Sequence, residues 1–315
     1  MAEIGKDIRK AKQLLEAGEL VAIPTETVYG LAANALNVSA VTKIFEVKNR
    51  PEFDPLIVHV PDLSHASLYV EEIPDLAKTL AERFWPGPLT LVVKRRNIIP
   101  DLVTSGLDTV GIRCPDHALT QELLQAVDFP LAAPSANPFG YVSPTTPHHV
   151  NEQLGNRIAY ILDGGACEVG IESTIVGFEN SVPVIYRMGG LSLERIETII
   201  GKVQMNAYSS SSPKAPGQLK SHYAPRKKVI LGNIIDLLKD YPLQRAALLT
   251  FKNDLQAPHQ FILSPSGNLE EAAQRLFTAL RTLDKMPIDV ILAEPVPNVG
   301  LGRAINDRLQ RASAE

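Results

Sequence analysis

The sequence predicts a protein of two α/β units, the first built on a mixed sheet and the second on a smaller parallel sheet. Three observations support this prediction. Up to about residue 208, short strands rich in β-branched residues cluster between a few helices. Residues 209–228 are rich in Ser and Pro and hold no acidic residue, which is typical of a linker. Residues 229–315 then alternate strand and helix, as βαβ units do.

In the first unit, the apolar spacing predicts helices over residues 4–15, 38–47 and 73–85 and strands over residues 20–23 and 55–60. Later segments bounded by Pro or Gly are expected as further strands, at residues 88–95, 109–115, 129–135, 160–165, 173–178 and 183–187. The last of these follow one another at hairpin spacing, so we expect a mixed sheet rather than a clean βαβ repeat.

In the second unit, four apolar runs predict strands, at residues 228–233, 245–251, 260–264 and 289–295. Residues 234–241 and 269–285 have helical spacing between them. We therefore expect a small parallel α/β layer.

The composition limits the class of protein. With 45% apolar and 21% charged residues, the chain can bury a core, and no apolar run approaches the roughly 20 residues of a membrane span. The charged, helical start does not resemble a signal peptide, and Cys114 and Cys167 form neither a disulfide framework nor a zinc site, so we expect a cytoplasmic protein. Residues 1–208 carry 17 basic against 25 acidic residues, whereas residues 209–228 carry 5 against 0. This balance disfavours wholesale nucleic-acid binding and leaves a local basic surface open.

The stretch "IPTETVYG", residues 23–30, places Thr25, Glu26 and Thr27 after an apolar strand. Polar residues at the carboxyl end of a parallel strand lie where open α/β sheets bind ligands. The alternative is that Thr25 or Thr27 caps a short helix while Glu26 points to water. This stretch alone does not decide between them.

Two further segments carry candidate binding residues. In "KNRPEFDPLIVHV", Lys48 and Arg50 precede a proline-stiffened loop, which suits a polyphosphate, although a solvated basic helix end is the common alternative. His59 in the same segment is polar within an apolar strand, where a lone His is more often a core residue. The loop over residues 131–147 is stiff and polar, and it is too long for a bare turn. Because no nucleotide-binding glycine motif, zinc motif or hydrolase motif occurs, the residues indicate only a basic, hydroxyl-rich cleft for an anionic small molecule.

Seven motifs occur in order: "PTETVYGLAANA", "KNRPEFDPLIVHV", "FWPGPLTLVVK", "VGIRCPDH", "LAAPSANPFGYVSPT", "GIESTIVGF" and "YRMGG". Together they resemble the Sua5/YrdC/YciO family, the threonylcarbamoyl-AMP synthases, over about residues 5–200. The segment "APGQLKSHYAPRKKV" and the residues after it resemble the longer, two-domain Sua5 form.

The resemblance implies an open, twisted mixed sheet with a concave cavity over residues 1–208, a linker at 209–228 that acts as a lid, and a smaller, Rossmann-like Sua5 C-terminal domain at 229–315. The implied reaction is a nucleotidyl transfer. L-threonine, bicarbonate and ATP, the last with Mg²⁺, give threonylcarbamoyl-AMP and pyrophosphate. A separate tRNA threonylcarbamoyl transferase complex then forms N6-threonylcarbamoyladenosine at position 37 of tRNA. A weak contact with tRNA stays open, and no membrane partner is expected.

The resemblance also assigns residues by motif. The implied catalytic residues are Lys48 and Arg50, which neutralise the triphosphate charge. The implied L-threonine contacts are Thr27, His59, Arg113, Ala133 and Ser173. The implied nucleotide contacts are Arg50, Asp54, Thr109, Ser135, Asn137, Ser143, Arg187 and Tyr223. The family usually has Asn where Asp54 stands, so the role of Asp54 is open, as are the role of Glu26, the general base and any metal ligand.

Two rival functions remain at this stage. One is a carbamoyl-adenylate module of the hydrogenase-maturation type, but that relative carries zinc-finger regions and this chain has two cysteines. The other is a YrdC-like RNA-binding protein without synthase activity, which the acidic first unit disfavours.

Overall fold

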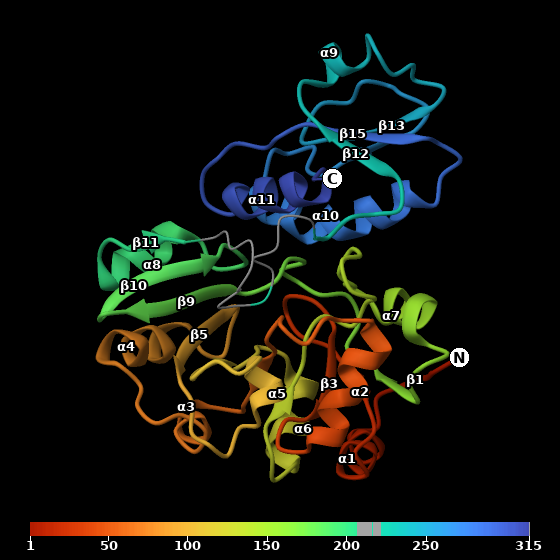
Figure 1. The fold of residues 1–315 in the computed structure, drawn as a ribbon. Helices are drawn as coiled ribbons and strands as arrows, with labels where there is room; N and C mark the ends of the chain where they lie inside the picture. Colours follow the sequence, from red (N-terminus) through yellow and green to blue (C-terminus); the bar gives the residue numbers. More distant parts are fainter. Residues whose placement is uncertain (207–215, 217–221, 315) are drawn as a thin grey trace.

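The computed structural model describes residues 1–206, 216 and 222–314, and these form two α/β units, one above the other in Figure 1. The larger unit is built on an 11-stranded sheet in the order β1-β8-β2-β3-β7-β4-β6-β5-β9-β10-β11. Its strands are β1 (Glu3–Gly5), β2 (Val21–Ile23), β3 (Gly30–Asn34), β4 (Ile57–His59), β5 (Leu89–Lys94), β6 (Thr109–Arg113), β7 (Leu131–Ala132), β8 (Tyr160–Leu162), β9 (Thr174–Glu179), β10 (Val182–Arg187) and β11 (Gln204–Met205). The helices that accompany them are α1 (Ile8–Glu16), α2 (Val38–Lys48), α3 (Leu63–Ala66), α4 (Asp75–Phe84), α5 (Asp101–Thr104), α6 (Ala118–Ala126), α7 (Pro147–Leu154) and α8 (Leu193–Ile200).

The predicted mixed sheet is confirmed. Strand β4 runs parallel to β6 and antiparallel to β7, and β9 and β10 form the expected antiparallel hairpin. The prediction of one helix over residues 4–15 is wrong at its start, because Ile4 pairs with Ile161 in β1 and β8. Helix α1 begins only after Asp7, whose side chain accepts hydrogen bonds from the backbone N–H groups of Arg9 and Lys10.

The end of helix α2 aims the segment that follows it into the protein. Its C-cap Asn49 has φ 51°, a left-handed conformation that Asn tolerates better than most residues. The chain turns there, and Arg50 donates its backbone N–H back to the carbonyl of Phe45. Lys48 and Arg50 are thereby buried rather than left at a solvated helix end.

The smaller unit is a four-stranded parallel sheet in the order β12-β15-β13-β14. Its elements are β12 (Lys228–Leu231), α9 (Ile234–Leu237), β13 (Ala246–Thr250), β14 (Gln260–Ile262), α10 (Leu269–Asp284), β15 (Val290–Ala293) and α11 (Gly302–Ala312). This confirms the predicted parallel layer. Figure 1 shows α10 and α11 between the small sheet and the larger unit, so these two helices form the face that docks.

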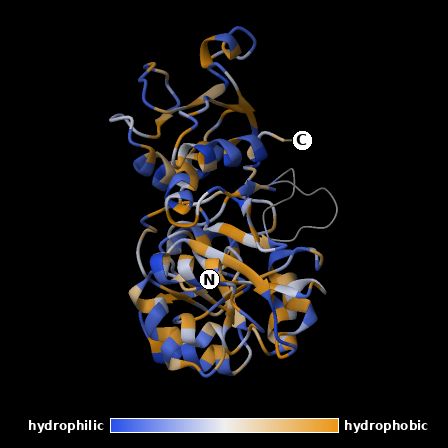
Figure 2. Ribbon diagram, turned by 90° about the vertical axis from the view of Figure 1, so that its left-hand side faces the viewer, coloured by the Kyte–Doolittle hydropathy of each residue, from blue (hydrophilic) through white to orange (hydrophobic). Residues whose placement is uncertain are grey.

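The two units share one apolar cluster across this face. Val28, Val142 and Ile171 of the larger unit pack with Ala273 and Phe277 of α10. Figure 2 shows the hydrophobic residues gathered along the strands inside each unit, with hydrophilic residues over the outer helices. Apolar surface is therefore buried both within each unit and between the two units, and both contributions stabilise the folded protein.

Polar contacts and close backbone packing complete the docking. The Arg281 guanidinium donates to the carbonyl oxygens of Val142, at 2.5 Å, and Ser143, at 3.2 Å. Gly170 has φ +77°, and a Cβ at this position would lie 2.4 Å from the Cα of Gln274. The approach of α10 to this loop therefore requires glycine for both its conformation and its lack of a side chain. Among the described residues, no helix is long and apolar enough to cross a membrane.

Candidate active site

A small cavity lies between the large sheet and the chain that leads into the smaller unit. Its free volume is about 50 Å³, and the residues that line it are Val28, Arg50, Pro55, Ile57, His59, Arg113, Ala133, Pro134, Ser135, Glu172, Arg187, Pro216, His222 and Tyr223. Three arginines face this cavity and Glu172 is the one carboxylate among its described lining residues. The cavity is thus a buried site with excess positive charge.

The residues singled out from the sequence fall into two groups around this cavity. Those that line it are Arg50, His59, Arg113, Ala133, Ser135, Arg187 and Tyr223. Six others stand behind the wall, each hydrogen-bonded or ion-paired to a lining residue: Thr27, Lys48, Asp54, Asn137, Ser143 and Ser173. Thr109 lies apart, beside a smaller pocket shared with Pro55 and Pro216.

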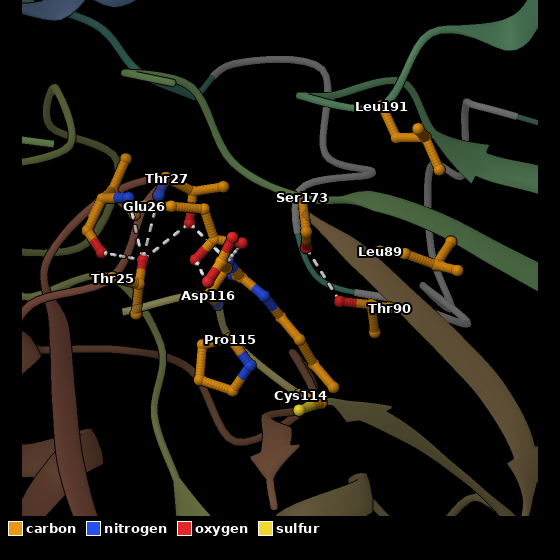
Figure 3. Close-up of polar contacts among 12 residues, drawn as sticks. Thr25, Glu26, Thr27, Leu89, Thr90, Cys114, Pro115, Asp116, Ser173 and Leu191 are labelled. Carbon is orange, nitrogen blue, oxygen red and sulfur yellow. Dashed lines mark hydrogen bonds and ion pairs between the residues drawn. The ribbon is translucent and has the colours of Figure 1, made fainter. Parts of the chain in front are cut away.

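The stretch after β2 forms the turn into β3, which pairs with β2 in antiparallel fashion. No helix starts here, so the alternative that Thr25 or Thr27 caps a helix is wrong. Thr25 nevertheless acts as a capping residue does, because its side chain accepts hydrogen bonds from backbone N–H groups. The Thr25 hydroxyl oxygen accepts from the backbone N–H groups of Thr27, at 3.2 Å, and Val28, at 3.1 Å. It therefore caps the turn (Figure 3). The Thr27 hydroxyl accepts a hydrogen bond from Arg113.

Glu26 orients Arg113, an assignment that sequence reasoning left open. Its Oε1 lies 2.7 Å from Nη2 of Arg113, and its Oε2 accepts from the backbone N–H of Asp116 at 3.1 Å. The same Nη2 donates to the Thr27 hydroxyl at 2.8 Å. Both side chains of the ion pair are nearly fully buried, so the guanidinium is held in one position on the cavity wall. Figure 3 shows Glu26 beside Thr25 and Thr27 of the turn and near Asp116.

Lys48 holds the loop after β7 instead of facing the cavity. Its Nζ donates to the carbonyl oxygens of Ser135, at 2.5 Å, and Asn137, at 2.6 Å. Burial, followed by the nearby charge of Arg50, lowers the pKa of Lys48 well below its ordinary value. An anion in the cavity would oppose both effects and favour the charged amine.

Asp54 is the buried counter-ion of Arg50. Its Oδ2 lies 2.8 Å from Nη2 of Arg50, and the two side chains are 0% and 4% exposed. Arg50 also donates to the backbone carbonyls of Asp54 and Pro55. Burial raises the pKa of Asp54, while the charges of Arg50 and Lys48 act against that shift. In this structure the departure from Asn thus corresponds to an ion pair that fixes Arg50.

Arg187 lines the cavity, and Ser173 holds it from behind. The Arg187 guanidinium donates to the carbonyl oxygen and to the hydroxyl of Ser173, both at 3.1 Å, and to the carbonyl of Pro216 at 3.3 Å. The Ser173 hydroxyl also lies 2.8 Å from that of Thr90 on β5, a contact drawn as a dashed line in Figure 3. Arg187 therefore links the hairpin β9–β10 to the chain that covers the cavity.

His222 and Tyr223 close the cavity from the side of the smaller unit. Tyr223 is 1% exposed, its φ is 64°, and its hydroxyl has no hydrogen-bond partner among the described residues. His222, which sequence reasoning did not assign, packs edge-on against Tyr223 at 4.1 Å between ring centroids. Ligand sites for molecules of drug size measure roughly 300–1,000 Å³. A nucleotide therefore enters only if part of this cover moves.

His59 is neutral in this site, which gives a pH-dependent prediction. Burial, followed by the charge of Arg113, lowers the pKa of His59 to about 3. The unfolded chain takes up this proton near the ordinary pKa of about 6.5 and the folded chain does not, so stability falls as pH drops through this interval. Between about pH 7 and 4.5, the melting temperature should fall less for a His59→Gln variant than for the parent. Calorimetry at each pH measures this.

The control for that experiment is His148→Gln, at an exposed position near the start of helix α7. It should keep the parent's dependence on pH. Equal slopes for the parent and His59→Gln would show that His59 titrates alike in both states.

Two family models together match nearly the whole chain. A family model for Sua5, YciO and YrdC proteins, described as "Telomere recombination", matches residues 13–189. The chain belongs to the Sua5/YrdC/YciO family. A second Sua5 model, described as "Threonylcarbamoyl-AMP synthase, C-terminal domain", matches residues 191–314. These two models meet between β10 and α8, whereas the two sheets divide between β11 and β12.

Several members of the Sua5/YrdC/YciO family match nearly the full chain. A threonylcarbamoyl-AMP synthase of Pyrococcus abyssi is 42% identical and covers 97% of this chain and 94% of its own length. One from Bacillus subtilis is 40% identical, with 97% and 92% covered. The crystal structure of P. abyssi Sua5 complexed with L-threonine matches with a TM-score of 0.92 at 40% identity, covering 99% of this chain and 97% of that one. Escherichia coli YciO, at 22% identity and a TM-score of 0.54, shares the fold of the larger unit.

The described residues offer little to hold a metal ion by themselves. No group of three or more His, Cys, Asp or Glu side chains comes together in them. Near the cavity, Asp54 is paired with Arg50, and Glu172 is paired with Arg308. Mg²⁺ therefore fits this site only as an ion carried by the phosphates of a nucleotide.

Proposed function

We propose that this cavity is a nucleotidyl transferase site that joins L-threonine, bicarbonate and ATP. The chain is a threonylcarbamoyl-AMP synthase, in keeping with its family and with 40–42% identity over nearly its whole length. The observation that carries the finer proposal is the convergence of buried Arg50, Arg113 and Arg187 on one cavity that has a single carboxylate among its described lining residues. Buried guanidinium groups that outnumber the carboxylates around them are stabilised by anions. This reaction supplies three anions: the carboxylate of L-threonine, bicarbonate and ATP.

The amino-acid side of the site would be the wall formed by Arg113. Glu26 and Thr27 fix one terminal nitrogen of this guanidinium, and its Nε has no hydrogen-bond partner among the described residues. That nitrogen is available to the carboxylate of L-threonine. The apolar side chains of Val28 and Ile57, with Ala133, line the same cavity. A partly dry environment favours the neutral form of the threonine amine, which is the form that attacks.

The nucleotide side would be the wall formed by Arg50 and Arg187, with Lys48 behind it. The neutral amine forms an N–C bond with the carbon of bicarbonate, and water leaves. An oxygen of the resulting carbamate then attacks the α-phosphorus of ATP, and the bond to the β-phosphate breaks to release pyrophosphate. Bound with ATP, Mg²⁺ would supply further charge neutralisation. The chain contributes position and fixed positive charge rather than a covalent nucleophile.

The linker 209–228 remains a proposed lid. Residues 209–215 and 217–221 of it lie outside the described part of the chain, while Pro216, His222 and Tyr223 line the cavity. Because the free volume is only about 50 Å³, these three residues are the ones whose displacement would admit ATP. The product would pass in the cytoplasm to a separate tRNA threonylcarbamoyl transferase.

A pyrophosphate assay tests the proposal. With ATP, bicarbonate and L-threonine, the chain is expected to release pyrophosphate, and omission of either threonine or bicarbonate should reduce release to background. Mass spectrometry of the mixture should show threonylcarbamoyl-AMP. If no pyrophosphate appears and the chain instead binds tRNA with a steep dependence on salt, the RNA-binding alternative holds.

A further inference from the structure

Arg308 joins the smaller unit to the wall of the cavity. It lies on α11 with its side chain 0% exposed, and its Nε donates to Oε2 of Glu172 at 2.9 Å. Its Nη1 donates to Oδ2 of Asp307 at 2.7 Å. Its guanidinium carbon lies 4.8 Å from the centroid of the Tyr223 ring. One side chain of the smaller unit thus touches two residues that line the cavity.

The first of those residues, Glu172, is the one carboxylate among the described residues that line the cavity into which ATP would bind. Its Oε1 accepts from the Ser143 hydroxyl at 2.6 Å, and its Oε2 is taken by Arg308. Without Arg308, this buried carboxylate would face incoming phosphates with no cation hydrogen-bonded to it. Repulsion between like charges is strong where water is excluded.

The second residue, Tyr223, is held between two side chains of the smaller unit. The Phe277 ring of α10 stacks on it at 5.6 Å with an interplanar angle of 28°, and the Arg308 guanidinium lies over it. The preceding His222 donates its backbone N–H to the carbonyl of Arg311 at 3.4 Å. The smaller unit therefore fixes the end of the linker at the point where it closes the cavity.

We propose that Arg308 is a positioning residue of the synthase site: it cancels the charge of Glu172 where ATP binds and holds Tyr223 over the cavity. This inference rests on the proposed entry of ATP into the cavity. It gives the smaller unit a part in nucleotide affinity, through a residue more than 300 positions from the start of the chain.

A purely structural role makes a different prediction. If Arg308 served only to dock the two units, the loss of any ion pair between them would act in the same way. Arg303, on the same helix, pairs with Glu194 of α8, and these side chains are 27% and 49% exposed. Neither Arg303 nor Glu194 lines the cavity, so Arg303→Met is the matched control.

The test uses the full chain with Arg308→Met, Glu172→Gln, their combination and the control. Steady-state pyrophosphate release gives KM for ATP, and calorimetry without ATP gives the dissociation constant for L-threonine. We expect Arg308→Met to raise KM for ATP by about tenfold or more, because a buried carboxylate loses its partner. Removing that carboxylate as well should restore KM to within about threefold of Glu172→Gln alone. Threonine affinity should stay within about twofold throughout.

Three outcomes are decisive. Rescue of KM for ATP by Glu172→Gln supports the proposal provided that threonine affinity is unchanged in Arg308→Met, since a general structural defect would lower threonine affinity as well. An unrescued double variant, or an Arg308→Met chain with the KM of Arg303→Met, overturns it. If Arg308→Met does not fold, the combination Arg308→Met with Glu172→Gln, which leaves no unpaired charge, is compared with Glu172→Gln alone, and values of KM for ATP more than about threefold apart overturn the proposal.

Failure of the underlying function is recognised separately. If the parent chain releases no pyrophosphate, a non-hydrolysable ATP analogue is titrated by calorimetry into the same variants. Loss and rescue of its binding would still support the role of Arg308, and equal binding by all variants would contradict it.

Discussion

Replacement of Arg113 by Met is expected to weaken binding of L-threonine by about a hundredfold or more, because truncating one partner of a buried charge pair costs about 2–5 kcal/mol. Arg113 faces the cavity with one nitrogen unpartnered among the described residues, and no second cation stands on that wall next to Glu26 and Thr27 in the part of the chain that the structure describes. Isothermal titration with threonine measures the loss.

The same substitution also destabilises the fold, because Glu26 loses its only ion-pair partner among the described residues. Breaking a buried pair costs about 3–5 kcal/mol of unfolding free energy. The combination Arg113→Met with Glu26→Gln removes the stranded charge and should recover much of that stability without recovering threonine binding. Threonine affinity equal to the parent in this stable double variant would refute the assignment of Arg113.

Replacement of Arg50 by Met is the second large effect. Asp54 is 0% exposed, and neither of its carboxylate oxygens has a partner in the described residues other than Arg50. We expect a loss of about 3–5 kcal/mol in the free energy of unfolding, measured with urea. We also expect ATP-dependent pyrophosphate release to fall by about a hundredfold or more, as when a preorganised phosphate contact is removed.

A double variant separates these two effects. Arg50→Met with Asp54→Asn leaves no buried charge behind and restores the residue type that the family usually has at position 54. Its stability should approach that of the parent, whereas its activity should stay as low as that of Arg50→Met. If activity returns together with stability, Arg50 acts only as a partner for Asp54 and not on the phosphates.

Much of this architecture was predictable from local pattern. The four strands of the smaller unit and the β9–β10 hairpin were each expected from apolar runs bounded by turn residues. Strand β1 was not, because Glu3–Gly5 is extended only through its pairing with Tyr160–Leu162 on β8. Such a contact joins segments far apart in the chain, and a three-residue strand is too short for its sequence periodicity to predict the contact.

In the candidate site, too, the sequence predicted some features and could not predict those that depend on contacts between distant segments. Motifs placed seven of the predicted residues on the cavity wall. Sequence reasoning could name Glu26 and Asp54 as anomalies and could not explain them, since each is defined by a partner that folding brings to it. The sequence did not indicate a role for Arg308, because that role depends on its contact with Glu172, which lies 136 positions earlier in the chain.

The apolar cluster shared by Val28, Val142 and Ile171 with helix α10 has a consequence for how the protein loses its structure. Neither unit can unfold without exposing part of the other's core, so melting should be a single cooperative transition. The connection between the units is then dispensable for holding them together once they have formed. A chain cleaved between residues 209 and 215 would still behave as one particle in solution, because the docked helices, and not the linker between the units, hold the two units together.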